Sequence, residues 1–206
     1  MGVYARYVLP HMLDCACGLA QVEAERARLV PLAHGRVLEV GIGTGRNLRH
    51  YDARRVNEIV GLDPATAMQP RAKSRLAGLG LDVSLLPVAA ERIPAAANSF
   101  DTVVVTYSLC SIAEPLVALA EMRRVLKPDG TLLFCEHGLA REPHIARWQA
   151  RLTPTWRRLA GGCHLDRDVP HLLAGAGFSL DWLDAGYIAG PKPLTHHYRG
   201  QAHGHG

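Results

Sequence analysis

The chain has 206 residues, of which 48% are hydrophobic, and this is enough to bury one sizeable core. Its formal net charge is only +4 and its arginines are scattered in pairs, which argues against binding to nucleic acid. No apolar run approaches the length that crosses a bilayer, and five cysteines without regular spacing argue against a disulfide framework.

The first residues do not have the pattern of a secretory signal. Arg6 and the pair Pro10 and His11 interrupt the early apolar residues, and no cleavage-like site follows. We therefore expect a cytoplasmic protein without a transmembrane segment. A peripheral contact with a membrane and the oligomeric state stay open.

Residues 1–30 are predicted to be helical, with Tyr4 and Tyr7 on an apolar face. Such a segment either packs as a lid over a binding site or covers the core in the ordinary way. Cys15 and Cys17 lie within it, but there is no second cysteine pair to complete a tetrahedron of ligands. The spacing therefore predicts thiols and no metal site.

From residue 36 onward, short β-rich runs alternate with helical patterns, as in a parallel sheet covered by helices on both faces. Strands are expected at 36–40, 57–62, 82–87, 101–106, 131–136, 179–184 and 194–202. Helices are expected at 115–126, 144–160 and 167–176, with a turn at 127–130 after the first of them. The fold class is α/β, one doubly wound Rossmann-like domain over 1–206, with its cofactor-binding core at 31–140 and further helices and strands at 141–206.

A glycine-rich turn follows the first strand, with Gly41, Gly43 and Gly45 at alternate positions, and a helix is expected after it. Glycines let the backbone approach a ligand closely, and the amides of the turn and of the helix N-terminus favour a carboxylate or a phosphate. A dinucleotide fingerprint requires glycine at the place that Arg46 occupies. This spacing argues against NAD as the ligand.

Asp63 ends the second strand, 22 positions after Gly41 and directly before Pro64. A carboxylate there can accept hydrogen bonds from both hydroxyls of a ribose. The alternative is a helix cap, because Asp before Pro suits an N-terminus. The glycine turn at the matching distance favours the ribose.

Four segments in sequence order, 37–45, 61–64, 99–105 and 124–130, resemble the successive motifs of class I S-adenosylmethionine-dependent methyltransferases. The resemblance implies a mostly parallel seven-stranded sheet with an antiparallel last strand, and S-adenosylmethionine as the cofactor. It places Glu39 and the glycine turn at the methionine end, Asp63 at the ribose, and Met68 and Ala90 beside the adenine. The full set of implied cofactor residues is Glu39, Gly41, Gly43, Gly45, Asn47, Asp63, Pro64, Met68, Ala90, Glu91 and Tyr107. Many relatives hold the adenine amino group with an Asp where this chain has Ala89.

A narrower resemblance extends over nearly the whole chain. Segments 107–112, 134–138, 152–156 and 161–167 are similar to bacterial relatives of the microsomal alkyl-thiol methyltransferases, whose membrane-bound members methylate small lipophilic thiols. Unlike those members, this chain is not expected to have a hydrophobic N-terminal anchor. Sequences of this type are also similar to quinone and phospholipid methyltransferases, which leaves the acceptor open.

A thiol acceptor has a pKa of about 8.5, so a neighbouring imidazole would raise its thiolate fraction. His137 is the first catalytic candidate because it follows the fifth strand at the carboxyl edge of the sheet; otherwise it only hydrogen-bonds Glu136 or a loop carbonyl. His164 is the second, with loop capping as its alternative. The acceptor pocket is expected to involve residues that in other contexts are simply core: Tyr4, Tyr7, Cys110, Trp148 and Tyr198.

We therefore expect an enzyme that methylates a small, lipophilic acceptor, with thiol sulfur favoured by the resemblance. Transfer to nitrogen, oxygen or carbon of a phospholipid amine or a quinone-like molecule is the alternative. A nucleotide-dependent oxidoreductase is a third hypothesis, against which Arg46 argues. A non-catalytic module that only binds S-adenosylmethionine is the fourth, and a missing acceptor pocket would favour it.

Overall fold

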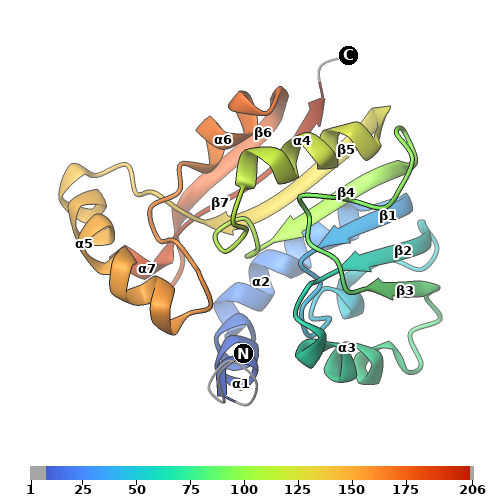
Figure 1. The fold of residues 1–206 in the computed structure, drawn as a ribbon, viewed down its shortest axis with the longest axis horizontal. Coiled ribbons are helices and arrows are strands. Elements are labelled where there is room, and N and C mark those ends of the chain that lie inside the picture. The colour runs from blue at the N-terminus through green and yellow to red at the C-terminus, as the bar shows by residue number, and fades with distance from the viewer. Residues whose placement is uncertain (1–7, 205–206) are drawn as a thin grey trace.

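A computed structural model describes residues 8–204 as one seven-stranded sheet with helices on both faces (Figure 1). The strands are β1 Gly35–Val40, β2 Val56–Leu62, β3 Val83–Leu86, β4 Phe100–Thr106, β5 Leu126–His137, β6 Phe178–Tyr187 and β7 His196–Gly204. The helices are α1 Leu9–Cys17, α2 Ala20–Leu29, α3 Gln69–Leu76, α4 Pro115–Val125, α5 Pro143–Leu159, α6 Val169–Gly175 and α7 Lys192–Thr195. Within this described part, no helix is long and apolar enough to cross a membrane.

The strand order is β3-β2-β1-β4-β5-β7-β6, and β7 runs antiparallel to both of its neighbours while the other pairs are parallel. This confirms the predicted fold class. The order reverses between β1 and β4, and in open sheets of this kind ligands bind outside the carboxyl ends of the strands at such a point.

The core has two layers, one on each face of the sheet. Successive residues of β4 show why: Val103 and Val105 belong to one buried cluster and Val104 to the other, because side chains alternate across a strand. The first layer includes residues of α4 and α6, and the second includes Leu29 at the end of α2. Both faces are covered, which explains why the strand interiors carry so few charges.

Each expected strand is present, as are the helices expected at 115–126, 144–160 and 167–176, and several of these elements begin or end at other residues than expected. The last strand begins at His196 rather than at 194 because the short helix α7 comes directly before it. Residues 127–130 lie within β5. The register of its pairing with β4 shifts at this place, between Phe100 and Thr102 of β4. Residues 127–130 therefore form a local irregularity of β5 and not a turn that precedes it.

The helix expected after the glycine turn is absent. Gly43 and Gly45 both have positive φ values, +54° and +77°, which an α-helix cannot contain. Only a single 3₁₀ turn, Leu48–His50, forms there. The predicted contribution of a helix N-terminus to ligand binding is therefore wrong.

A buried amide ties α5 to the end of β5. The side chain of Gln149 accepts a hydrogen bond from the Ala140 amide at 2.8 Å. It also donates to the carbonyl oxygens of Gly138 at 2.9 Å and Pro193 at 3.2 Å. One residue thus holds three segments that surround the carboxyl edge of the sheet.

We predict that Gln149→Ala lowers the free energy of unfolding by about 2–4 kcal/mol, because three buried backbone groups lose their partner. Urea denaturation measures the change. Gln201→Ala is the control, since its hydrogen bond to Asp181 is exposed. Equal small losses in the two variants would contradict this account of Gln149.

Candidate functional site

The glycine turn lies directly after β1 and its conformation requires glycine. Gly41 has a φ of +72°, and a Cβ atom there would collide with the Ser108 side chain, which follows β4. A Cβ at Gly45 would lie 3.0 Å from the Cα of Ala72 in α3. The turn is therefore packed closely between its neighbours, and its positive φ at Gly41 is of the kind that the sequence predicts for these glycines.

Asp63 leaves the end of β2 and reaches the same turn. Its Oδ2 accepts a hydrogen bond from the Gly43 amide at 2.9 Å, and its Oδ1 accepts one from the Ala65 amide at 2.7 Å. Burial raises the pKa of this carboxyl, although both backbone hydrogen bonds act to lower it. Helix α3 begins later and has Met68 at its N-cap, so Asp63 does not cap it. Each carboxylate oxygen keeps a further lone pair for a ligand.

A crevice of about 460 Å³ opens beside Asp63. Seven of the residues predicted to bind the cofactor line it: Gly41, Asp63, Pro64, Met68, Ala90, Glu91 and Tyr107. The remaining four, Glu39, Gly43, Gly45 and Asn47, do not. The crevice combines the carboxylates of Asp63 and Glu91 with apolar walls from Met68, Val88 and Ala90, and this composition fits a nucleoside whose ribose is polar and whose base is flat.

Glu39 and Asn47 form a buried polar network behind the turn. Glu39 accepts hydrogen bonds from Asn47 Nδ2 at 3.1 Å and from the Tyr51 hydroxyl at 2.9 Å. The Asn47 oxygen accepts a hydrogen bond from Arg26 of α2 at 2.7 Å, and Arg26 also donates to Thr106 at 2.5 Å. The network connects α2, β1 and β4 and holds the glycine turn in place.

We predict a pH-dependent stability that originates at Glu39. Burial raises the pKa of this carboxyl to about 7, against hydrogen bonds from Tyr51 and Asn47 that lower it. The native protein therefore binds this proton more tightly than the unfolded chain. The contribution of Glu39 to the free energy of unfolding should fall by up to about 3 kcal/mol as the pH rises from about 4.5 to 7. It should stay constant at higher pH.

Urea denaturation of the native chain and of Glu39→Gln over this pH range measures the effect. The difference in the free energy of unfolding between the two proteins should change with pH, because glutamine does not ionise. Parallel pH curves would contradict the assignment.

A second, more apolar cavity of about 380 Å³ adjoins the crevice. Both are lined by Leu13, Tyr107, Ser111 and Gly161, so they meet at a common wall. Tyr107 follows β4 with a φ of +52°, a conformation that a non-glycine residue rarely adopts and that occurs often at functional sites. Two ligands bound side by side would touch at this wall.

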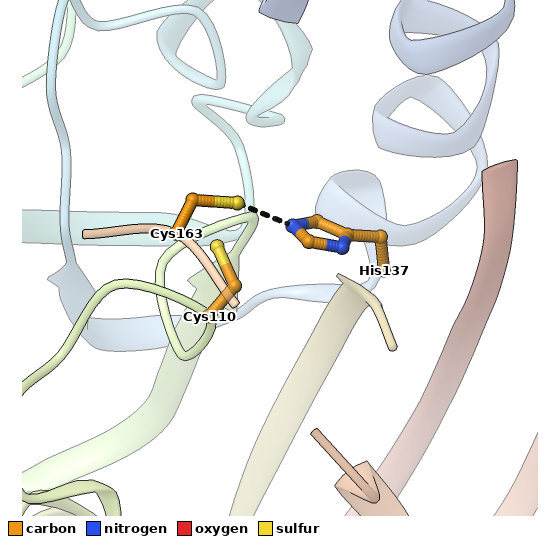
Figure 2. Close-up of side chains that lie close together, drawn as sticks. All are labelled: Cys110, His137 and Cys163. Atoms are coloured by element: carbon orange, nitrogen blue, oxygen red, sulfur yellow. Dashed lines mark hydrogen bonds between the residues drawn. The ribbon is translucent and has the colours of Figure 1, made fainter. Parts of the chain in front are cut away.

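Three chemically reactive side chains line the second cavity and face one another (Figure 2). His137, the last residue of β5, has its Nε2 3.1 Å from the Sγ of Cys163, in the loop after α5. Cys110, in the loop after β4, brings its sulfur to the same place, and the three ligand-type atoms lie within 4.8 Å of one another. The Trp156 indole also donates to the Cys163 sulfur at 3.3 Å.

Hydrogen bonding within this cluster changes its proton affinities. The hydrogen bonds from Cys110 and His137 to the Cys163 sulfur lower the pKa of that thiol. Burial alone would lower the pKa of His137, but its hydrogen bond to Cys163 and the negative charges of Cys163 and Glu136 together raise it. The Cys163 thiol therefore loses its proton more readily, and the raised pKa makes the His137 imidazole a stronger base.

The structure places the other predicted site residues away from this cluster. His164 lines neither cavity; its backbone amide donates to the Cys110 carbonyl oxygen at 2.8 Å. Trp148 is 53% exposed on α5 and stacks with Arg151. Tyr198 is buried and donates to the Leu139 carbonyl oxygen at 2.5 Å. Tyr4 and Tyr7 lie outside the described residues.

Sequence reasoning missed residues on both sides of the common wall. Cys163 stands next to His164, and the sequence pattern favoured the histidine, but the thiol faces the cavity. Leu13 and Cys17 of α1 line the second cavity, and Asp14 fixes this helix to the glycine turn. Asp14 accepts hydrogen bonds from Thr44 at 2.5 Å and Arg46 at 3.0 Å. The N-terminal helix thus lies across both cavities.

Comparison with known proteins identifies the class. Residues 38–134 match the family described as the methyltransferase domain. A solved structure described as an S-adenosylmethionine-dependent methyltransferase, possibly a histamine N-methyltransferase, from Thermotoga maritima has a TM-score of 0.68 and 18% identity, with 97% of each chain covered. This likeness shows the fold.

Curated relatives refine the match. Human Thiol S-methyltransferase TMT1B is 35% identical over 172 residues, which is 75% of this chain and 69% of the relative. Its counterpart from Rattus norvegicus is 34% identical over 71% of this chain and 62% of its own length. A demethylmenaquinone methyltransferase from Renibacterium salmoninarum is 39% identical over 49% of this chain and 40% of its own length.

The chain belongs to the S-adenosylmethionine-dependent methyltransferase family. Within this family, thiol S-methyltransferases match about three-quarters of the present chain. The match spans roughly six-tenths of the length of the rat relative. S-adenosylmethionine is the cofactor that this family membership implies.

Proposed function

We propose that this chain transfers the methyl group of S-adenosylmethionine to the sulfur of a small lipophilic thiol. The observation that carries the proposal is the apolar cavity that shares a wall with the crevice and contains a histidine and two thiols. The similarity to thiol S-methyltransferases supports sulfur as the accepting atom. A built acceptor cavity also argues against a module that only binds the cofactor.

The residues of the crevice define how the cofactor is held. Asp63 accepts the two ribose hydroxyls with its free lone pairs, and Met68 and Ala90 pack against the adenine. The turn that begins at Gly41 faces the methionine end of the cofactor, with Glu39 behind it. When bound, S-adenosylmethionine supplies an electrophilic methyl group, and the enzyme contributes alignment and exclusion of water.

The residues that line the acceptor cavity indicate which class of acceptor reacts. Apolar side chains such as Leu13, Val22 and Leu194 favour a lipophilic body, and the cluster around His137 favours a group that can lose a proton. A free thiol is mostly protonated at neutral pH. We assign to His137 the withdrawal of this proton, and His164 is set aside because it lines neither cavity. A reducing compartment such as the cytoplasm would keep these thiols reduced.

The second candidate is methyl transfer to a quinone-like carbon or to a phospholipid amine. The similarity to a demethylmenaquinone methyltransferase favours it, over half of the chain only. Both candidates share the cofactor site and differ in the acceptor atom.

A panel of alkyl thiols, primary amines, phenols and a demethylated quinone, with products identified by mass spectrometry, separates the two. We expect methylated thiols to be the dominant products. Methylation of the quinone or the amines with no thioether formed would overturn the proposal.

A further inference from the structure

We propose that Cys110, His137 and Cys163 form a three-ligand zinc site whose fourth position opens into the acceptor cavity and takes the sulfur of the acceptor thiol. This rests on the proposed function only for the identity of the fourth ligand. The three protein ligands rest on their own geometry.

The three ligand atoms are close enough to share one ion. They lie within 4.8 Å of one another, and the His137 Nε2 and Cys163 Sγ are 3.1 Å apart (Figure 2). Zinc bonds of about 2.0–2.3 Å at tetrahedral angles separate ligand atoms by about 3.5–3.8 Å. Shifts of no more than about one ångström in the side chains would therefore close the site.

The donor set is the one that zinc selects. Two thiolates and one imidazole are soft and borderline ligands, and three protein ligands with an open fourth position are typical of catalytic zinc rather than structural zinc. Two thiolates and a neutral imidazole also cancel the charge of a divalent ion. The filled site can then lie beside an apolar cavity without an uncompensated charge.

Backbone hydrogen bonds hold the three ligand segments together. The Glu136 carboxylate accepts the amides of Ser108 at 2.7 Å and Leu109 at 3.0 Å, and so joins the loop before Cys110 to the end of β5. The His164 amide donates to the Cys110 carbonyl oxygen at 2.8 Å and joins the two cysteine loops. The ligands are thus positioned before any ion binds.

Two further groups surround the site. The Arg167 guanidinium donates to the carbonyl oxygens of Leu109 and Ile112 and attracts the charges of Cys110 and Cys163. Its positive charge offsets the additional negative charge of a third thiolate. The Trp156 indole donates to the Cys163 sulfur and leaves it further lone pairs for a metal.

The chemical step at this site is a ligand addition. The S–H bond of the acceptor breaks, its proton passes to solvent water, and the thiolate sulfur forms a bond to zinc. No oxidant or reductant is involved. His137 then acts on the acceptor through the metal rather than as its direct base, which refines the role assigned above.

Cobalt substitution tests the site without relying on activity. The protein is stripped with a chelator in a non-thiol reductant and titrated with Co²⁺. We expect one equivalent to bind, with visible bands of a tetrahedral ion and a near-ultraviolet thiolate-to-cobalt band. Adding an alkyl thiol should intensify the charge-transfer band, because a third sulfur enters the coordination sphere.

Variants assign the ligands. Cys163→Ser and His137→Gln should weaken zinc binding by more than about 100-fold. Cys135→Ser is the control, because Cys135 is another free cysteine of the chain and lies outside the cluster. Circular dichroism shows whether each variant is folded, and Cys163→Ser leaves the fully buried core positions untouched.

A native chain that shows no saturable cobalt spectrum would overturn the zinc site, as would a folded Cys163→Ser variant with an unchanged spectrum. The acceptor panel run with stripped and zinc-loaded protein separates this failure from that of the proposed function. Full thiol methylation by stripped protein would overturn the zinc site and leave the function standing. A complete cobalt spectrum with no thiol methylated would contradict the function instead.

Discussion

Asp63→Ala is expected to weaken S-adenosylmethionine binding by at least about 100-fold, which corresponds to about 2.7 kcal/mol. Hydrogen bonds to a charged group contribute about 1.5–3 kcal/mol each, and a carboxylate that accepts two ribose hydroxyls would lose both. The crevice has no second carboxylate at the end of β2 that could replace it among the described residues. Isothermal titration calorimetry measures the affinity.

Two further variants separate ligand binding from support of the turn. Asp63 also accepts the amides of Gly43 and Ala65, so Asp63→Asn is included because its remaining oxygen can still accept one of them. Asp129→Ala removes an exposed carboxylate on β5 and should leave the affinity unchanged. If Asp63→Ala bound S-adenosylmethionine as tightly as Asp129→Ala, the ribose assignment would be wrong.

His137→Ala is expected to lower the turnover of a thiol acceptor by at least about 100-fold while cofactor affinity changes little. The side chain lines the acceptor cavity and not the crevice, so its loss affects deprotonation of the acceptor and spares the cofactor. This holds both for a direct proton acceptor and for a zinc ligand. Initial rates at saturating cofactor, together with calorimetry, measure the two quantities.

His164→Ala is the matched control for this prediction. His164 is adjacent to Cys163 in sequence, yet its side chain lines neither cavity, and we expect nearly native turnover. Loss of turnover in His164→Ala with native rates in His137→Ala would reverse the assignment. Equal native rates in both would return His137 to a structural role.

Seven of the eleven residues that the sequence assigned to the cofactor line one crevice of the structure. Strand ends and glycines are local signals, so the turn after β1 and the carboxylate after β2 could be placed from spacing alone. The helix expected after the turn was wrong, since only the 3₁₀ turn Leu48–His50 forms there.

The acceptor side depended on contacts that spacing does not encode. Cys110, His137 and Cys163 lie 27 and 26 positions apart and come from three different segments, whereas metal motifs in sequence are recognised by short intervals. The sheet brings two of them together because β4 and β5 are neighbours. The third arrives through the loop after α5, whose path depends on tertiary packing. Trp148 was expected in the pocket, but Trp156, two helical turns further on, faces the cavity instead.

The most direct test of the account is calorimetry of the native chain with S-adenosylmethionine, its demethylated product and NAD. We predict saturable binding of the first two at one site per chain and no binding of NAD, because Arg46 stands where a dinucleotide site needs glycine and is held there by Asp14 and Glu23. Binding of NAD without binding of either adenosyl compound would contradict the account.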